Sequence, residues 1–126
     1  MLRVETLRLL ADIGFMATGS GFSPQAECIF RAIEVAKPRS LAPHIGLALN
    51  CMNNKQHQMA LDILEKKALP LEPENPIIRA YVGMALMMLG RASESERCLT
   101  AVARGDDEPA KTLATQLLSQ LRQPPK

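Results

Sequence analysis

Apolar residues recur along this chain with the period of an α-helix. Leu7, Leu10, Ile13 and Ala17 are spaced by three or four residues, which places them on one side of a helix. No alternating run of β-branched residues indicates a strand. Segments rich in Gly, Pro and Asn interrupt the pattern and divide it into seven predicted helices, over residues 3–18, 23–36, 40–53, 57–67, 76–89, 93–104 and 108–122. The chain is therefore expected to be all-α.

The pattern also repeats along the chain. Ala26 and Ala60 are 34 residues apart, and Pro38 and Pro73 are 35 residues apart. A helix–turn–helix unit of about 34 residues is the period of tetratricopeptide (TPR) repeats. The sequence thus predicts a right-handed, TPR-like α-solenoid, although an unrelated helical bundle with coincidental spacing is the alternative.

Small residues recur where two helices of such a unit would approach each other closely. Gly14, Ala48 and Gly83 occupy equivalent positions in three units. Gly21 and Gly90 fall in the turn inside a unit, where a positive φ is often needed. The second unit has Lys55 in that turn instead of Gly. We expect one domain over residues 1–122, with repeats at about 3–38, 40–73 and 76–105, and a frayed tail at 123–126.

A stack of repeats cannot end on a bare apolar face. The predicted helix 108–122 carries Ala110, Leu113, Leu117 and Leu121 on one side and polar residues on the other. This helix is therefore predicted to cap the C-terminal end of the stack.

Composition and charge exclude several classes of function. The 126 residues are 47% hydrophobic but only 3% aromatic, and the formal net charge is +2. A nucleic-acid-binding protein would show a basic stripe or exposed aromatic residues, so no nucleic-acid partner is expected. The three Cys include no C-x-x-C pair, and no apolar stretch is long enough for a membrane helix. We expect a cytoplasmic protein that does not insert into membranes.

Residues with chemical potential are few. His44, Cys51 and His57 form a conceivable metal site, but their spacing matches no common one and a fourth ligand is not evident. No nucleophile–base pair can be proposed from the sequence. We therefore expect neither enzyme activity, nor a bound metal, nor any other cofactor.

A second apolar stripe suggests a binding surface. In a TPR stack the first helix of each repeat lines a concave surface, about 100° around the helix from its core stripe. The residues predicted there are apolar and rich in methionine: Phe15, Ile45, Leu49, Met52, Ile77, Met84, Met87 and Met88. An apolar groove with adaptable Met side chains suits an amphipathic partner helix. The alternative is that these residues are simply buried in the core.

The first repeat resembles a known family. Residues 9–19, LLADIGFMATG, followed by residues 25–29, QAECI, are similar to the N-terminal repeat of the bacterial type III secretion chaperones that guard the needle subunit. The tight resemblance covers about residues 5–36, and the rest agrees in repeat pattern and length. The resemblance implies a cytosolic chaperone that prevents premature polymerisation of the needle subunit.

The same resemblance implies two partners. The C-terminal amphipathic helix of the needle subunit would lie in the concave groove and contact the eight residues predicted there. A small helical co-chaperone would pack on the first helix, where Leu2, Val4 and Leu9 are apolar residues not needed for the core.

Two other interpretations remain open. The related TPR chaperones of translocator proteins carry a dimerisation segment ahead of the repeats. Nothing precedes the first repeat helix in this sequence, so this class ranks second. A general TPR scaffold for protein–protein interaction is the third interpretation.

Overall fold

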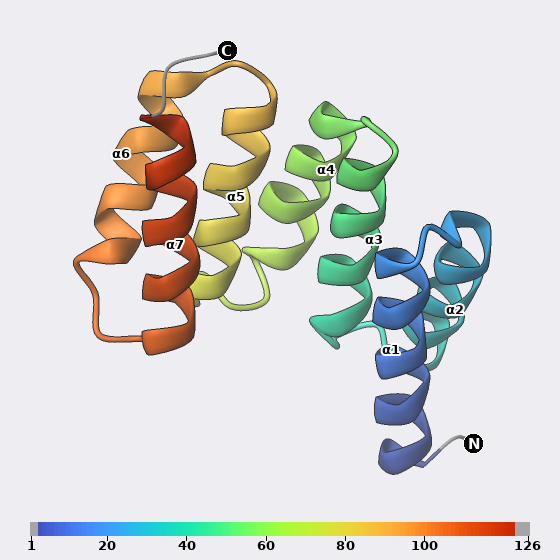
Figure 1. Ribbon diagram of the computed structural model, residues 1–126. Helices are drawn as coiled ribbons and strands as arrows, with labels where there is room; N and C mark the ends of the chain where they lie inside the picture. The colour runs from blue at the N-terminus through green and yellow to red at the C-terminus, as the bar shows by residue number, and fades with distance from the viewer. Residues whose placement is uncertain (1–2, 123–126) are drawn as a thin grey trace. The chain divides into compact units, whose positions relative to one another are not determined.

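The computed structural model describes residues 3–122, and its regular elements in this range are all helical (Figure 1). The predicted helices are present, and the all-α prediction is confirmed. Leu2 and the predicted frayed tail at 123–126 lie outside the described residues. The elements are α1 (Val4–Gly19), α2 (Ser23–Ala36), α3 (Ala42–Asn53), α4 (His57–Ile63), the π-helix η1 (Leu64–Ala68), α5 (Pro76–Met88), α6 (Ala92–Ala103) and α7 (Glu108–Leu121).

The predicted helix 57–67 differs from expectation in its second half. There α4 passes directly into η1, and the Leu69 N–H donates to the Leu64 carbonyl oxygen at 2.8 Å. This spacing of five residues is that of a π-helix, which usually occurs as a short segment.

The chain divides into two compact units, residues 1–72 and 73–126. The first contains α1 to α4 and η1, and the second contains α5 to α7. The division coincides with the predicted boundary between the second and third repeats. The prediction of one domain over 1–122 stays a prediction.

The core of the first unit is built around Phe30 of α2, which is fully buried. A Cβ atom at Gly14 of α1 would lie 2.8 Å from Phe30 Cζ, and one at Gly46 of α3 would lie 2.2 Å from the same atom. The ring of Phe30 therefore lies against two helix backbones at places that carry no side chain. Ala11, Ala26, Ile33 and Leu47 complete this cluster.

The turns between paired helices repeat the same backbone conformation. Gly21 has φ +83°, Gly90 has φ +79°, and Lys55 has φ +63°, all in the left-handed region. These three positions are 34 and 35 residues apart. Lys55 thus takes the conformation of the missing turn glycine, although a residue with a Cβ adopts it less readily.

Side-chain amides tie the end of α3 to the turn between α1 and α2. Asn53 Nδ2 donates to the Thr18 carbonyl oxygen, and Asn50 Nδ2 donates to the Ser23 carbonyl oxygen, both at 3.0 Å. These bonds satisfy carbonyl groups near the end of α1 and the start of α2. They link the first predicted repeat to the second.

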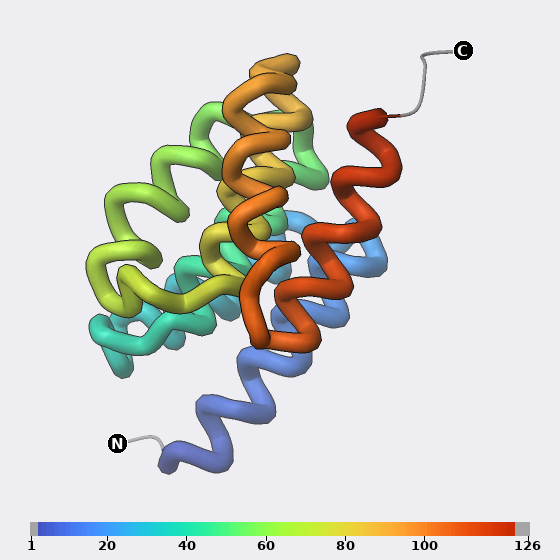
Figure 2. The backbone as a smooth tube through the Cα atoms, turned by 90° about the vertical axis from the view of Figure 1, so that its left-hand side faces the viewer, coloured from blue at the N-terminus to red at the C-terminus, as the bar shows by residue number. Residues whose placement is uncertain are grey.

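The core of the second unit also contains a glycine packed against a large side chain of a neighbouring helix. A Cβ atom at Gly83 of α5 would lie 2.5 Å from Leu99 Cδ2 of α6, so these helices also approach through a glycine. Ser95 of α6 is fully buried, and its Oγ donates to the Gly83 carbonyl oxygen at 2.7 Å. Helix α7 runs beside α6 (Figure 2) and buries Ala110 and Leu117.

The predicted apolar stripe of α1 packs only in part. Leu7, Leu10 and Ala17 are partly buried and pack against the Phe30 cluster, whereas Ile13 is 43% exposed. Ala11, Gly14 and Thr18 are the buried residues of this helix. The contact between Gly14 and the Phe30 ring fixes which side of α1 faces α2.

We predict that Gly46→Ala destabilises the protein. The added methyl would overlap the Phe30 ring, which is enclosed in the core and has little room to move. Overpacking of this kind costs about 1–3 kcal/mol in the free energy of unfolding. Urea unfolding followed by circular dichroism measures the change.

Gly19→Ala is the matched control, because nothing lies within 4 Å of a Cβ atom at Gly19. Its stability should equal the parent's or exceed it by at most about 1 kcal/mol, the helix preference of Ala over Gly. Equal stability of Gly46→Ala and the parent would contradict the packing described for Phe30.

Candidate functional site

The predicted partner-binding residues of the first unit differ in accessibility. Ile45 is 8% exposed and Met52 is 5% exposed, so neither offers much surface in the free chain. Leu49 and Phe15 are partly buried. The Phe15 ring meets Phe30 edge-on, with centroids 5.0 Å apart and an interplanar angle of 63°. Of this set, Leu49 and Phe15 keep the surface that a partner could contact.

The predicted residues of the second unit lie along α5. Ile77, Met84 and Met87 are partly buried and pack against a cluster that includes Leu117 and Leu118 of α7. Met84 and Met87 therefore pack in part against the core and keep only part of their surface accessible. Met88, at the end of α5, is 43% exposed. Together these side chains form a methionine-rich, partly accessible surface on one helix.

A third apolar surface lies on α1. Leu9, Ile13 and Met16 are 60%, 43% and 71% exposed, and their spacing of four and three residues places them on one side of the helix. Only Leu9 was predicted to bind a partner. The signal for the other two was present in the spacing. The spacing alone is ambiguous, because Ile13 also fits the apolar stripe of Leu7, Leu10 and Ala17.

The residues predicted for the co-chaperone do not lie together. Val4 and Leu9 are five residues apart on α1, which separates them by about 140° around the helix. Val4 lies beside Leu7 and Ala11 at the side facing α2 and α3, whereas Leu9 belongs to the exposed apolar side. Leu2 is outside the described residues, so of this set only Leu9 lies on the exposed stripe.

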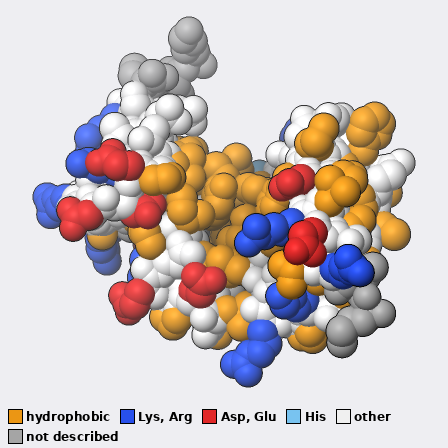
Figure 3. Space-filling view, turned by 90° about the horizontal axis from the view of Figure 1, so that it is seen from below, with side chains coloured by type: hydrophobic (Ala, Val, Ile, Leu, Met, Phe, Trp, Pro, Cys, Tyr) orange, Lys and Arg blue, Asp and Glu red, His pale blue; other side chains and the backbone are white. Residues whose placement is uncertain are grey.

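Apolar side chains reach the surface among charged ones over the face in Figure 3. The described residues include further exposed apolar side chains, Phe22, Val35 and Met59, at 57%, 83% and 52%. Within residues 3–122, no helix combines the length and apolar character needed to cross a membrane.

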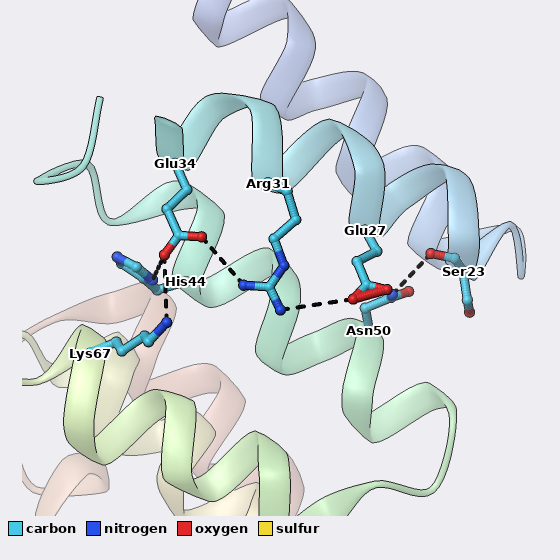
Figure 4. Close-up of polar contacts among 7 residues, drawn as sticks. All are labelled: Ser23, Glu27, Arg31, Glu34, His44, Asn50 and Lys67. Carbon is cyan, nitrogen blue, oxygen red and sulfur yellow. Dashed lines mark hydrogen bonds and ion pairs between the residues drawn. The ribbon is translucent and has the colours of Figure 1, made fainter. Parts of the chain in front are cut away.

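A charged cluster joins α2, α3 and η1 in the first unit (Figure 4). The Glu34 carboxylate lies 3.3 Å from Arg31 Nη1, 3.6 Å from Lys67 Nζ and 3.9 Å from His44 Nδ1. Burial alone would raise the pKa of Glu34, but Lys67, the hydrogen bond from Arg31 and the nearby His44 together lower it below its usual value. The cluster thus favours the charged form of a partly buried carboxylate.

The conceivable metal site is not assembled. No three His, Cys, Asp or Glu side chains in the described part of the chain lie together so that they could hold a metal ion. His44 lies against Glu34, and Cys51 lies farther along α3. Burial, assisted by Glu27, raises the pKa of the Cys51 thiol, which makes it a poorer thiolate ligand or nucleophile.

The fold is similar to that of several solved structures. No family model and no curated protein sequence matches the chain. A chain in the heterotrimeric complex that regulates type III secretion needle formation superposes with a TM-score of 0.77 at 19% identity, over 95% of this chain and all (100%) of that one. The type III secretion translocator chaperone SycD of Yersinia enterocolitica gives 0.77 at 20% identity, over 96% of this chain and 84% of SycD.

A chain of a type III secretion complex from Aeromonas hydrophila gives a TM-score of 0.75 at 21% identity, covering 94% of this chain and 80% of that one. These superpositions show the fold, and because the identities are below 25% they do not assign a function. The chain has the TPR-like helical repeat fold of these proteins, as predicted.

We predict that Glu34 contributes to acid sensitivity. Because folding lowers the pKa of this carboxyl, its stabilising effect is full above the unfolded-state pKa, near 4.5, and is lost as pH falls through the folded-state value. Glu34→Gln should therefore be less stable than the parent at pH 7, and the difference should shrink between about pH 5 and pH 3. Thermal melts across this pH range measure it.

Glu65→Gln, a change at an exposed residue of η1, is the control and should shift the melting temperature little at any pH. A Glu34→Gln variant whose melting temperature parallels the parent's at every pH would show that the cluster does not stabilise the charged form.

Proposed function

We propose that this protein is a type III secretion chaperone that holds the C-terminal amphipathic helix of the needle subunit and keeps that subunit from polymerising. Two findings support the proposal. The fold is shared with chains of type III secretion complexes, including one that regulates needle formation. The observation that carries it is the methionine-rich surface of α5, formed by Ile77, Met84, Met87 and Met88.

The chemistry of this surface suits a helix better than a polar or extended ligand. An amphipathic helix presents apolar residues every three or four positions, and Met84, Met87 and Met88 have the same spacing. Their unbranched thioether side chains can adjust to the shape of a partner. In the first unit, Leu49 and Phe15 keep partly accessible apolar surface, whereas Ile45 and Met52 are buried.

We assign the co-chaperone to the exposed apolar side of α1. Leu9, Ile13 and Met16 together present more apolar surface than a lone exposed residue, and such patches commonly mark interfaces. A small helical partner could pack along this stripe. The sequence predicted Leu2, Val4 and Leu9 for this interface. The proposed interface keeps Leu9 and adds Ile13 and Met16.

A translocator chaperone is the second candidate. The observation that favours it is the equal TM-score of 0.77 to SycD. Co-expression separates the two candidates, because the first predicts a stable complex with the needle subunit and the second a stable complex with a translocator protein.

We predict that Leu49→Glu with Met88→Glu abolishes co-purification of the needle subunit while the chaperone stays folded. Leu49 is partly buried and Met88 is 43% exposed, so both carboxylates can stay hydrated in the free chain. In the complex, an unpaired carboxylate against an apolar helix would be costly. Pull-down with a tagged needle subunit and circular dichroism are measured together.

Val35→Glu with Met59→Glu is the matched control, since both residues are exposed and lie outside the proposed surface. This variant should bind like the parent. Retained binding by Leu49→Glu/Met88→Glu would count against the assigned surface, and loss of helicity would show that these two residues are core.

We also predict that the isolated protein self-associates through α1 and that Leu9→Lys with Met16→Lys makes it monomeric. The two lysines place charges within the apolar stripe, so they oppose its burial against a second copy. Sedimentation velocity over a range of concentrations tests this, with Val35→Lys as the control. A parent that is monomeric at high concentration would refute the prediction.

A further inference from the structure

The first unit contains a cavity that none of the assigned surfaces uses. Its volume is about 300 Å³, and it lies where the start of α1, the end of α2 and the start of α3 meet. Most of its lining is apolar and comes from Val4, Leu7, Ala11, Ile33 and Ala42. This volume is at the lower end of the range for ligand sites, so it fits a group the size of one or two side chains better than a long alkyl chain.

The polar groups at this cavity are all suited to an anion. Arg8 of α1 and Lys37, which follows α2, are its charged lining residues, and Ser40 adds a hydroxyl. Among the described residues, neither the Arg8 nor the Lys37 side chain takes part in an ion pair. The acidic residues of α1, Glu5 and Asp12, do not line the cavity. Neither cation therefore has a carboxylate oxygen within 4.0 Å among the described residues.

An apolar wall beside two cations selects a particular kind of ligand. A neutral apolar group would make no use of the two cations, and a phosphate would make no use of the apolar wall. A carboxylate attached to an apolar side chain satisfies both parts. Such a group occurs at the C-terminal end of a polypeptide whose last residue is apolar.

We infer that this cavity binds the free C-terminal carboxylate of a polypeptide that ends in an apolar residue, with Arg8 and Lys37 holding the carboxylate and the apolar wall holding the side chain. Only the source of that polypeptide, a bound secretion partner, rests on the proposed function. Helix α3 begins at Ala42, which lines the cavity, and it has no acidic residue in its first turn. The positive end of its dipole therefore also favours a negatively charged group there.

Two peptides test the inference directly. N-acetylated Gly-Gly-Ser-Gly-Leu-Leu with a free carboxylate and the same peptide with a C-terminal amide are titrated into the full chain, followed by amide chemical shifts. We expect the acid to bind at least about ten-fold more tightly, because charge-assisted hydrogen bonds distinguish the two. The largest shifts should occur at residues of the cavity, such as Leu7, Ala11 and Ser40.

Variants separate a built site from general attraction of charge. Arg8→Gln with Lys37→Gln should remove the difference between acid and amide. Lys66→Gln with Lys111→Gln, which lowers the net charge equally at residues outside the cavity, should preserve it. Equal binding of acid and amide, or a preference that survives Arg8→Gln/Lys37→Gln in a folded protein, would overturn the inference.

Octanoate is a third probe. Binding of octanoate at the cavity without binding of the peptide acid would overturn the assignment in favour of a lipid acid. The titrations use neither the needle subunit nor Leu49 and Met88. The inference and the proposed function can therefore fail separately: loss of the partner complex leaves the peptide result intact, and the reverse also holds.

Discussion

Close helix packing at glycines opposite large side chains is the constraint on which the rest of the structure depends. Phe30 lies against Gly14 and Gly46 in the first unit, and Leu99 lies against Gly83 in the second. A side chain at any of these glycines would occupy space that the ring or the leucine fills. These contacts fix how each helix is rotated, and so they decide which apolar residues are buried and which remain for partners.

The sequence pattern is sufficient to predict the helices and the repeat. The period of three and four residues predicts the helices, and the spacing of 34 to 35 residues reappears in the left-handed turns at Gly21, Lys55 and Gly90. Lys55 shows that the turn conformation follows the repeat even where glycine is absent. The fold was predictable because both signals are local and act within one unit of the repeat.

The buried and exposed sides of each helix were harder to predict, because an apolar stripe on one helix does not indicate which other helix packs on it. Ile45 and Met52 fit an open surface by spacing yet are buried, and Ile13 shares the apolar stripe of the first helix yet is 43% exposed. The cavity could not be predicted from the sequence for the same reason. Arg8 and Lys37 are 29 residues apart, and only the packing of α1 and α2 brings them to one site.

The proposed function requires that the methionine-rich side of α5 receives the partner helix. The chain has seven methionines, which report separately if their methyl groups are labelled with carbon-13. On titration with the C-terminal helix of a needle subunit, we expect large methyl shifts at Met84, Met87 and Met88. Met59, which is 52% exposed and lies outside this surface, should change little. Shifts at Met59 with none on α5 would contradict it.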